Sequence, residues 1–339
     1  MRSDKPKVLN LLAGKPLLTH VYETAMKIEH REIYIVYGCG GEQVKNTLKN
    51  SQVCWIEQEE QLGTGHAVQQ VLPNIPKSDH ILILYGDVPL ISEVSLAKLI
   101  EAATNTGLSL LTAYFDEPHG YGRIVRDDND NIIAIVEEKD ATIEQQNICE
   151  VNAGFMVISA EILNQWIDFL KNKNKQNEYY LTDMVEIAVK NNIRVSPILA
   201  ESAIEVQGVN TRSQLSEAER YYQIMQAHHL MDKGVGIADP SRFDLRGSLE
   251  IGLDNEIDVN VVMEGKLKLG NNNTIAPNCV IKDTIIGNNV RIFANSVIEN
   301  SIIGNDCHIG PFARIRPDSV LEDHVHIGNF VEIKKSTLC

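Results

Sequence analysis

Short apolar runs alternate with longer amphipathic segments along the first two-thirds of the chain. The apolar runs have the length of β-strands and lie at residues 33–37, 53–57, 81–85, 108–115, 132–137 and 154–159. The segments with helical spacing lie at residues 17–28, 42–48, 66–71, 94–103, 160–170, 180–191 and 215–231. Strands that alternate with helices are typical of an α/β fold with a largely parallel sheet. We therefore predict such a domain here.

Beyond Gly247 the aliphatic residues recur every six positions, with only two steps of five. The series consists of Ile251, Ile257, Met263, Leu269, Ile275, Ile281, Ile286, Ile292, Ile298, Ile303, Ile309, Ile315, Leu321, Ile327 and Ile333. A six-residue repeat is typical of a parallel β-helix, in which three short faces form one coil and each aliphatic side chain points into the core. The series predicts about five coils. Cys279 and Cys307 occupy small positions of the repeat, where we interpret them as core residues.

The length of 339 residues supports about two domains. We predict an α/β domain at 1–211, a linker helix at 212–234 and a β-helix at 235–339. The formal net charge of -15 disfavours nucleic acid and anionic membranes as partners. No apolar run approaches the roughly 18 residues of a membrane span, and the first residues lack the apolar core of a signal peptide, which favours the cytoplasm. The six cysteines show neither metal-ligand spacing nor a disulfide framework.

Asp87 is the first candidate for chemistry, because it follows the apolar run 81–85 in the segment Y-G-D-V-P-L. Ligands of open α/β sheets collect at the carboxyl ends of parallel strands, and a carboxylate beside a phosphate is a natural Mg²⁺ ligand. The same pattern fits a structural turn before Pro89. The spacing alone leaves both interpretations open.

A glycine-rich turn, Q-L-G-T-G-H-A, opens the predicted helix at 66–71. Backbone N–H groups at a helix start favour an anion or the edge of a base. The turn lacks the Lys-Ser/Thr pair of a Walker loop and the third glycine of the dinucleotide fingerprint. Lys7 suits a phosphate, and Gly122, within G-Y-G-R-I, suits the close approach of a sugar. Other polar positions each fit a structural role when taken alone; they are Glu137, Asn152 and Asn210.

Taken in order, these motifs resemble one family, the bacterial bifunctional N-acetylglucosamine-1-phosphate uridyltransferase and glucosamine-1-phosphate N-acetyltransferase. The resemblance covers essentially the whole chain through P-K-V-L, E-Q-L-G-T-G-H-A, L-Y-G-D-V-P-L, G-Y-G-R-I, V-E-E-K-D-A, E-V-Q-G-V-N, R-F-D-L-R-G and I-G-P-F-A-R-I-R-P. It implies a Rossmann-like nucleotidyltransferase domain followed by a left-handed β-helix of hexapeptide repeats that assembles as a homotrimer. It also implies synthesis of UDP-N-acetylglucosamine, the sugar donor for peptidoglycan and lipopolysaccharide, from UTP and N-acetylglucosamine 1-phosphate.

The resemblance also implies roles for individual residues. Asp87 and Asn210 would hold Mg²⁺, and Lys7 would contact phosphate. The positions implied for the uracil end are Gln58, Gly63 and Thr64. The positions implied to line the nucleotide-sugar site are Tyr85, Gly86, Gly122, Glu137 and Asn152. In the β-helix, Arg316 and Lys334 match residues that bind the sugar phosphate of the acetyltransferase site. The implied uridylyl transfer is an in-line attack of the sugar phosphate on the α-phosphorus of UTP, without a covalent enzyme intermediate.

The chain departs from the family pattern at both ends. The family opens with a strand and a glycine-rich L-x-x-G-x-G-T-R-M loop, and Met1 aligns with the Met of that loop. The chain stops just after Lys334 and Lys335, before the coils that carry the catalytic His, the acetyl-CoA site and the capping tail. The catalytic Arg and His of the family therefore fall outside this sequence. We expect a piece of the enzyme, truncated at both ends, with no acetyltransferase activity and with severely reduced or absent uridyltransferase activity.

Three other functions stay open from the sequence. The first is another sugar-1-phosphate nucleotidyltransferase with a β-helix tail, such as an adenylyl- or thymidylyltransferase, although E-Q-L-G-T-G-H-A together with Y-G-D-V-P-L favours uridyl transfer. The second is a non-catalytic assembly or regulatory subunit that keeps the trimerising β-helix. The third is a scaffold without a ligand.

Overall fold

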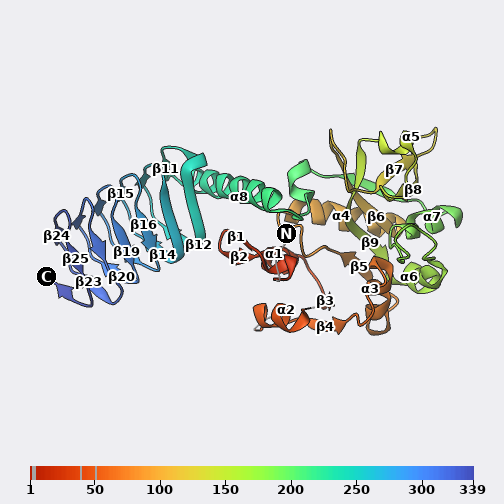
Figure 1. Ribbon diagram of the computed structural model, residues 1–339, viewed down its shortest axis with the longest axis horizontal. Coiled ribbons are helices and arrows are strands. Elements are labelled where there is room, and N and C mark those ends of the chain that lie inside the picture. The colour runs from red at the N-terminus through yellow and green to blue at the C-terminus, as the bar shows by residue number, and fades with distance from the viewer. Residues whose placement is uncertain (2–4, 39, 50–51) are drawn as a thin grey trace. The chain divides into compact units, whose positions relative to one another are not determined.

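The computed structural model of the chain divides into two compact units (Figure 1). It describes residues 1, 5–38, 40–49 and 52–339. The first unit consists of residues 1–10 and 16–211, and the second of residues 11–15 and 212–339. Strands β1 (Leu11–Leu12) and β2 (Lys15–Pro16) form a short hairpin that contains residues 11–15, the early segment that belongs to the second unit. Among the described helices, none combines the length and the apolar character needed to cross a membrane.

The first unit contains seven helices among its described residues. They are α1 (Leu17–Ala25), α2 (Gly41–Thr47), α3 (Thr64–Val71), α4 (Glu93–Thr106), α5 (Ile143–Gln146), α6 (Ala160–Trp166) and α7 (Asp183–Lys190). Its short 3₁₀ turns are η1 (Lys7–Leu9), η2 (Leu72–Asn74), η3 (Ile167–Phe169) and η4 (Ala203–Val206). The longest helix, α4, follows ordinary capping rules, because the Ser92 hydroxyl accepts a hydrogen bond from Ser95 N–H and Gly107 ends the helix at φ +78°.

The strands of the first unit form two separate sheets. They are β3 (Tyr34–Tyr37), β4 (Cys54–Glu57), β5 (His80–Ile83), β6 (Leu108–Tyr114), β7 (Arg123–Arg126), β8 (Ile132–Val136), β9 (Glu150–Ser159) and β10 (Ser196–Leu199). The larger sheet has the order β10-β6-β9-β7-β8, with β5 also paired to β9, while β3 and β4 pair with each other.

The prediction of a largely parallel sheet is wrong. Only β10–β6 and β3–β4 run parallel among the described strands of this unit, whereas β5, β6 and β7 are antiparallel to β9 and β7 is antiparallel to β8. A continuous apolar run reports burial on both faces of a strand, not its direction. β6 and β9 are buried on both faces, so their runs resemble those of parallel strands.

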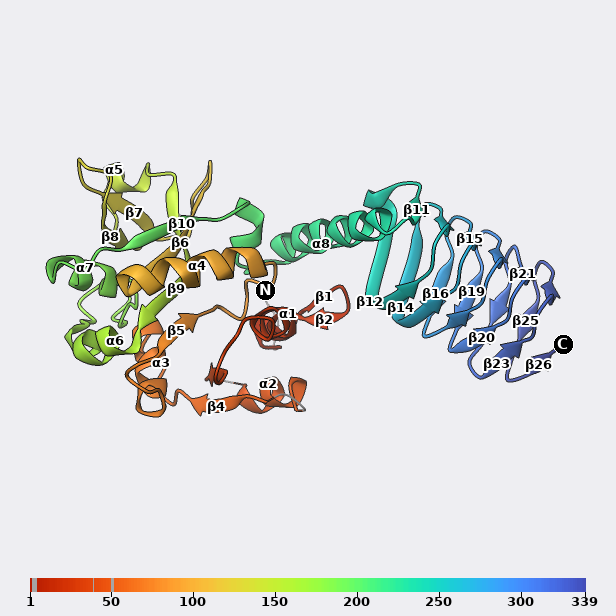
Figure 2. The ribbon, with the colours of Figure 1, turned by 180° about the vertical axis from the view of Figure 1, so that it is seen from behind.

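Two hydrophobic cores lie on opposite faces of the larger sheet. Leu110 of β6 belongs to the core that includes Leu163 of α6 and Met184 of α7, whereas Leu111 belongs to the core that includes Leu96 of α4. Figure 2 shows α4 lying in front of β6 and β9. The sheet is therefore the middle layer of an α/β fold, as the sequence predicts.

The second unit opens with α8 (Arg212–Asp232) and continues as a parallel β-helix. Its strands form two parallel sheets, and the short turn η5 (Pro240–Arg242) lies between β11 and β12. One contains β11 (Gly236–Ile237), β13 (Glu256–Ile257), β15 (Thr274–Ile275), β18 (Arg291–Ile292), β21 (His308–Ile309) and β24 (His326–Ile327). The other contains β12 (Phe243–Ile251), β14 (Val261–Leu269), β16 (Val280–Lys282), β17 (Ile285–Ile286), β19 (Val297–Glu299), β20 (Ser301–Ile303), β22 (Arg314–Ile315), β23 (Ser319–Leu321), β25 (Glu332–Ile333) and β26 (Thr337–Leu338). This architecture is consistent with the predicted left-handed β-helix.

The six-residue series forms the core of this β-helix. Ile257 pairs with Ile275, 18 positions later, and Ile275 pairs with Ile292, only 17 positions later. The shorter coil contains the five-residue step from Ile281 to Ile286. The two irregular steps in the sequence are therefore places where one turn of a coil is one residue shorter.

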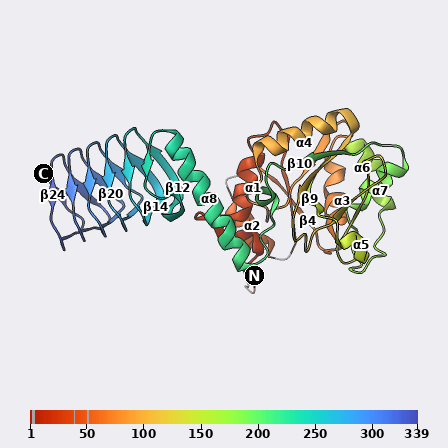
Figure 3. The same ribbon diagram turned by 90° about the horizontal axis from the view of Figure 1, so that it is seen from above.

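The coils of the β-helix stack one on the next (Figure 3). At one of their turns, asparagine side chains join each coil to the next. Asn288 Oδ1 accepts a hydrogen bond from Asn271 N–H at 2.7 Å, and Asn305 Oδ1 accepts one from Asn288 N–H at 2.9 Å. Gly270 precedes this turn, where an added Cβ would lie 2.4 Å from Asn288 Oδ1 and 2.7 Å from Gly287 O. Close stacking of the coils therefore requires glycine at that position.

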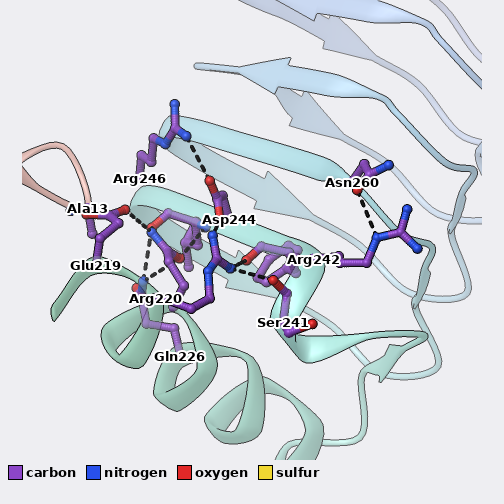
Figure 4. Close-up of polar contacts among 12 residues, drawn as sticks. Ala13, Glu219, Arg220, Gln226, Ser241, Arg242, Asp244, Arg246 and Asn260 are labelled. Atoms are coloured by element: carbon purple, nitrogen blue, oxygen red, sulfur yellow. Dashed lines mark hydrogen bonds and ion pairs between the residues drawn. The ribbon is translucent and has the colours of Figure 1, made fainter. Parts of the chain in front are cut away.

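Helix α8 covers the first edge of the β-helix (Figure 4). The buried Gln223 side chain accepts a hydrogen bond from Leu245 N–H at 2.7 Å and donates one to Leu245 O at 3.1 Å. Arg220 donates to Ser241 O at 2.8 Å and to Asp244 at 2.7 Å. Gln223 therefore supplies the hydrogen bonds that a further strand would otherwise make with Leu245 of β12.

Candidate functional site

Lys7, Asp87 and Asn210 meet in the first unit although they are far apart in the sequence. The Lys7 ammonium forms an ion pair with Asp87 and donates a hydrogen bond to Asn210 Oδ1 at 2.7 Å. The backbone fixes the same arrangement, because Val209 N–H donates to Asp87 O at 2.9 Å. The Asp87 side chain is only 17% exposed, so its charge is partly removed from water.

Asp87 lies past the carboxyl end of β5, which ends at Ile83, as its position in the sequence suggests. The expectation that β5 is a parallel strand is wrong, since its pairing with β9 is antiparallel. The structure nevertheless gives Asp87 a cationic partner, which a plain turn before Pro89 does not need. Asp87 therefore belongs to a polar cluster rather than to a turn alone.

The oxygen donors of this cluster fit a hard divalent cation. Asp87 supplies a carboxylate and Asn210 an amide oxygen, which are ligands that Mg²⁺ prefers. No group of three or more His, Cys, Asp or Glu side chains suited to a metal occurs among the residues that the structure describes. Two protein oxygens leave most positions of an octahedral ion to water and phosphate, as is usual for Mg²⁺. The residues present therefore fit Mg²⁺ that binds together with a phosphate-containing ligand.

The glycine-rich turn opens α3, and residues before it and from a later segment of the chain hold it in place. Gln58, which follows β4, donates to Gly63 O at 3.1 Å. The Thr64 hydroxyl accepts a hydrogen bond from Leu181 N–H at 3.0 Å. Gly63 has φ +110°, and an added Cβ would lie 2.6 Å from Tyr179 O. Only glycine fits this approach of two backbone segments.

Tyr85 is packed against a glycine of the central strand. An added Cβ at Gly154 would lie 2.9 Å from the Tyr85 ring, and one at Gly86 would lie 3.1 Å from a leucine side chain of α1. Burial raises the pKa of the Tyr85 hydroxyl to about 12, and the charges of Glu137 and Asp87 add to this rise. Tyr85 therefore stays protonated, with its hydroxyl available as a neutral hydrogen-bonding group.

Gly122, Glu137 and Asn152 lie close to one another in the first unit. Asn152 N–H donates to Gly122 O at 2.8 Å, and an added Cβ at Gly122 would lie 3.4 Å from Glu137 Oε1. The Thr182 hydroxyl donates to Glu137 Oε1 at 2.9 Å. Burial raises the pKa of Glu137, while the bond from Thr182 opposes this rise. The structure thus brings these three predicted positions together.

Sequence reasoning missed Tyr121 and Asp183 as neighbours of the site. The Tyr121 ring stacks on Phe115 with 4.9 Å between centroids, and its hydroxyl accepts a hydrogen bond from Gly208 N–H at 3.4 Å. Burial raises the pKa of Asp183 to about 6, with nearby carboxylates, Glu186 first, adding to the rise. Tyr121 stands between the two glycines of G-Y-G-R-I, a signal that could have found it. Asp183 carries no comparable signal.

Arg316 and Lys334 lie on neighbouring coils of the second unit. Arg316 N–H donates to Ile333 O at 2.9 Å, and its guanidinium donates to Glu332 Oε1 at 3.3 Å. Lys334 is exposed. The coil register thus brings two cationic positions to the same face, beside one carboxylate.

Two family models match parts of the chain. Residues 1–142 match the MobA-like NTP transferase domain, and residues 245–339 match the GMPPB C-terminal domain. The chain resembles a solved structure of UDP-glucose pyrophosphorylase complexed with UDP-glucose, with a TM-score of 0.52 and 18% identity over 64% of this chain and 90% of that one. A likeness at this identity shows the fold of the first unit.

Curated relatives match over the whole chain. The chain is 49% identical over 338 residues to the bifunctional protein GlmU of Acinetobacter baumannii strain AYE. This match covers 100% of the chain and 74% of that protein. The chain is also 49% identical over 339 residues to the bifunctional protein GlmU of Methylococcus capsulatus strain Bath, with the same coverage.

Proposed function

Because the chain belongs to the family of bifunctional GlmU proteins, we propose that its first unit transfers a uridylyl group from UTP to N-acetylglucosamine 1-phosphate. A phosphate oxygen of the sugar attacks the α-phosphorus of UTP, the bond from that phosphorus to the bridging oxygen breaks, and pyrophosphate leaves. The product is UDP-N-acetylglucosamine. The observation that carries the proposal is the cluster of Lys7, Asp87 and Asn210, a cation beside two oxygen donors in a nucleotidyltransferase fold.

Asp87 and Asn210 would hold Mg²⁺ in this reaction, and the ion would neutralise charge on the phosphates. Lys7 would bind phosphate oxygens through its ammonium, which forms an ion pair with Asp87. Asp87 in turn keeps the ammonium oriented toward the cluster. Positioning and charge neutralisation together supply the acceleration, because no residue forms a covalent bond to the substrate.

The ends of the nucleotide sugar would bind on either side of this cluster. Gln58, Gly63 and Thr64 would read the uracil through amide, hydroxyl and backbone groups at the start of α3. The sugar side consists of Tyr85, Gly86, Gly122, Glu137 and Asn152. The grouping of Gly122, Glu137 and Asn152 at one place supports the proposal.

For the second unit we propose the family's sugar-phosphate role. Arg316 and Lys334 would bind the phosphate of glucosamine 1-phosphate, with acetyl-CoA as co-substrate in the full-length parent. The shared face of these two cations supports this role. Assembly as a homotrimer is proposed as well, and the stacked, exposed rings of Phe312 and Phe330, with 5.3 Å between centroids, support it because exposed aromatic pairs are typical of interfaces.

The test measures pyrophosphate release from UTP and N-acetylglucosamine 1-phosphate with Mg²⁺, together with the affinity for UDP-N-acetylglucosamine. We expect binding of UDP-N-acetylglucosamine by the wild-type chain, severely reduced turnover, and loss of the remaining turnover in Asp87→Ala. ATP and dTTP in place of UTP test the adenylyl and thymidylyl alternatives. Binding without turnover would favour a non-catalytic subunit, and absence of both signals would show that the proposal is wrong.

A further inference from the structure

Arg123 is a charged side chain that is almost completely buried, with 1% of its surface exposed. Its guanidinium donates to Tyr121 O, and its Nε donates to Gln146 O at 3.4 Å. Its Nη2 forms an ion pair with Glu138 Oε2 at 3.3 Å. These acceptors belong to the turn before β7, the end of α5 and the segment after β8. Arg123 therefore joins three segments at one point.

Glu138 holds the same turn from the other side. Its carboxylate accepts a hydrogen bond from Gly120 N–H as well as from Arg123. Removing an arginine from water is costly, and a buried ion pair often adds no more stability than apolar residues of similar volume. A gain in folding stability is therefore a weak explanation for the presence of this ion pair. A contribution to local geometry fits its contacts, which tie the turn at 119–122 to the segment after β8 and to the end of α5.

The residues beside this pair face the nucleotide-sugar site. Gly122 precedes Arg123, and Glu137 precedes Glu138. Arg123 pairs with Val136 across β7 and β8, so Gly122 and Glu137 are also cross-strand neighbours. Successive residues of a strand point to opposite faces, so the ion pair lies behind the surface that Gly122 and Glu137 line.

We propose that Arg123 and Glu138 are positioning residues that hold Gly122 and Glu137 where these receive the sugar of the nucleotide sugar. This inference rests on the proposed function. The pair acts through its two neighbours and makes no contact with the ligand itself. The positions proposed for the uracil end, Gln58 and Thr64, are held by other contacts within the protein. Loss of the pair should therefore weaken recognition of the sugar and leave recognition of the uridine monophosphate part unchanged.

The same strand offers a matched control. Arg126, at the other end of β7, makes a bidentate ion pair with Glu150, with Nε and Nη2 at 2.8 and 2.7 Å from the two carboxylate oxygens. This pair has similar chemistry, with side-chain exposures of 22% for Arg126 and 7% for Glu150 against 1% for Arg123 and 31% for Glu138, and it does not border Gly122 or Glu137. A general loss of stability in this sheet should appear in both pairs, whereas an effect on the sugar should appear only in the first.

The experiment compares Glu138→Ala, Glu138→Gln, Arg123→Met and the control Glu150→Gln with the wild-type chain. Titration calorimetry with Mg²⁺ gives the affinity of each for UDP-N-acetylglucosamine and for UMP. Glu138→Ala and Arg123→Met should raise the Kd for UDP-N-acetylglucosamine about 10-fold or more and change the Kd for UMP less than about twofold. Glu138→Gln should lie between wild type and Glu138→Ala, because its amide oxygen still accepts hydrogen bonds. Amide hydrogen exchange at residues 116–126 should be faster in Glu138→Ala and unchanged in Glu150→Gln.

Three results would overturn the inference while leaving the proposed function intact. They are an unchanged Kd for UDP-N-acetylglucosamine in Glu138→Ala, an equal weakening of both ligands in that variant, and an equal effect of Glu150→Gln on the sugar ligand. A wild-type chain that binds neither ligand would refute the proposed function, and the inference would fail with it. The two failures are thus distinguished by the wild-type titration alone.

Discussion

Replacing Gln223 with alanine should open strand β12 of the β-helix locally. Its side chain pairs with both backbone groups of Leu245, and Gln223 itself is completely buried. The variant leaves Leu245 N–H buried without its acceptor, which costs about 2 kcal/mol. Loss of the buried side-chain methylene adds about 1 kcal/mol. We therefore expect the free energy of opening at this strand to fall by about 3 kcal/mol.

Gln226→Ala is the control. Gln226 also donates a hydrogen bond to Leu245 O, at 3.0 Å. When this bond is lost, Leu245 O still accepts the hydrogen bond from Gln223. The expected cost of Gln226→Ala is about 1 kcal/mol or less. Native-state hydrogen exchange on peptides spanning 241–247 measures both effects, and it avoids the assumption that a chain of two units unfolds in one step. Equal effects of the two variants would refute the argument that Gln223 takes the place of a neighbouring strand.

Two further predictions concern stability. Gly270→Ala should destabilise the β-helix by about 2 kcal/mol or more, because its Cβ would lie 2.4 Å from Asn288 Oδ1; a urea midpoint equal to that of wild type would contradict this. Burial raises the pKa of Asp183 from 3.8 to about 6. Between these two values the native state binds more protons than the unfolded state. The contribution of this group to the free energy of unfolding therefore falls as pH rises from about 4 to about 6. Asp183→Asn should remove this decline in urea midpoints measured across pH 4 to 7, and a decline that persists unchanged would assign it to other groups.

The β-helix could be predicted in detail from the sequence because its signal is local. Every sixth residue from Ile251 onward faces the core, and the two five-residue steps correspond to shorter coils. The direction of the strands in the first unit was not predictable in the same way. Strand β9 carries a polar start at Glu150 and Asn152, so its apolar run marks only its second half. β10 carries Pro197 within four residues and has no apolar run of its own.

The candidate site could be predicted only in part. Individual motifs indicated Asp87 and Gly122, but nothing in their spacing joins Lys7 to Asn210, which lie 203 positions apart. That grouping came from the resemblance to a family, and the structure then brought the two side chains together. The ion pair of Arg123 with Glu138 was beyond prediction, since a buried arginine in a strand has no sequence pattern that separates it from an exposed one.

The asparagine turns of the β-helix have a consequence for the order in which it can fold. Each of these turns places an N–H against a side chain of the following coil, as Asn271 does with Asn288 and Asn288 with Asn305. A coil is therefore complete only when its successor is in place, whereas α8 closes the first edge with its own side chains. Order can thus spread from α8 one coil at a time, and a fault in one coil weakens its predecessor first.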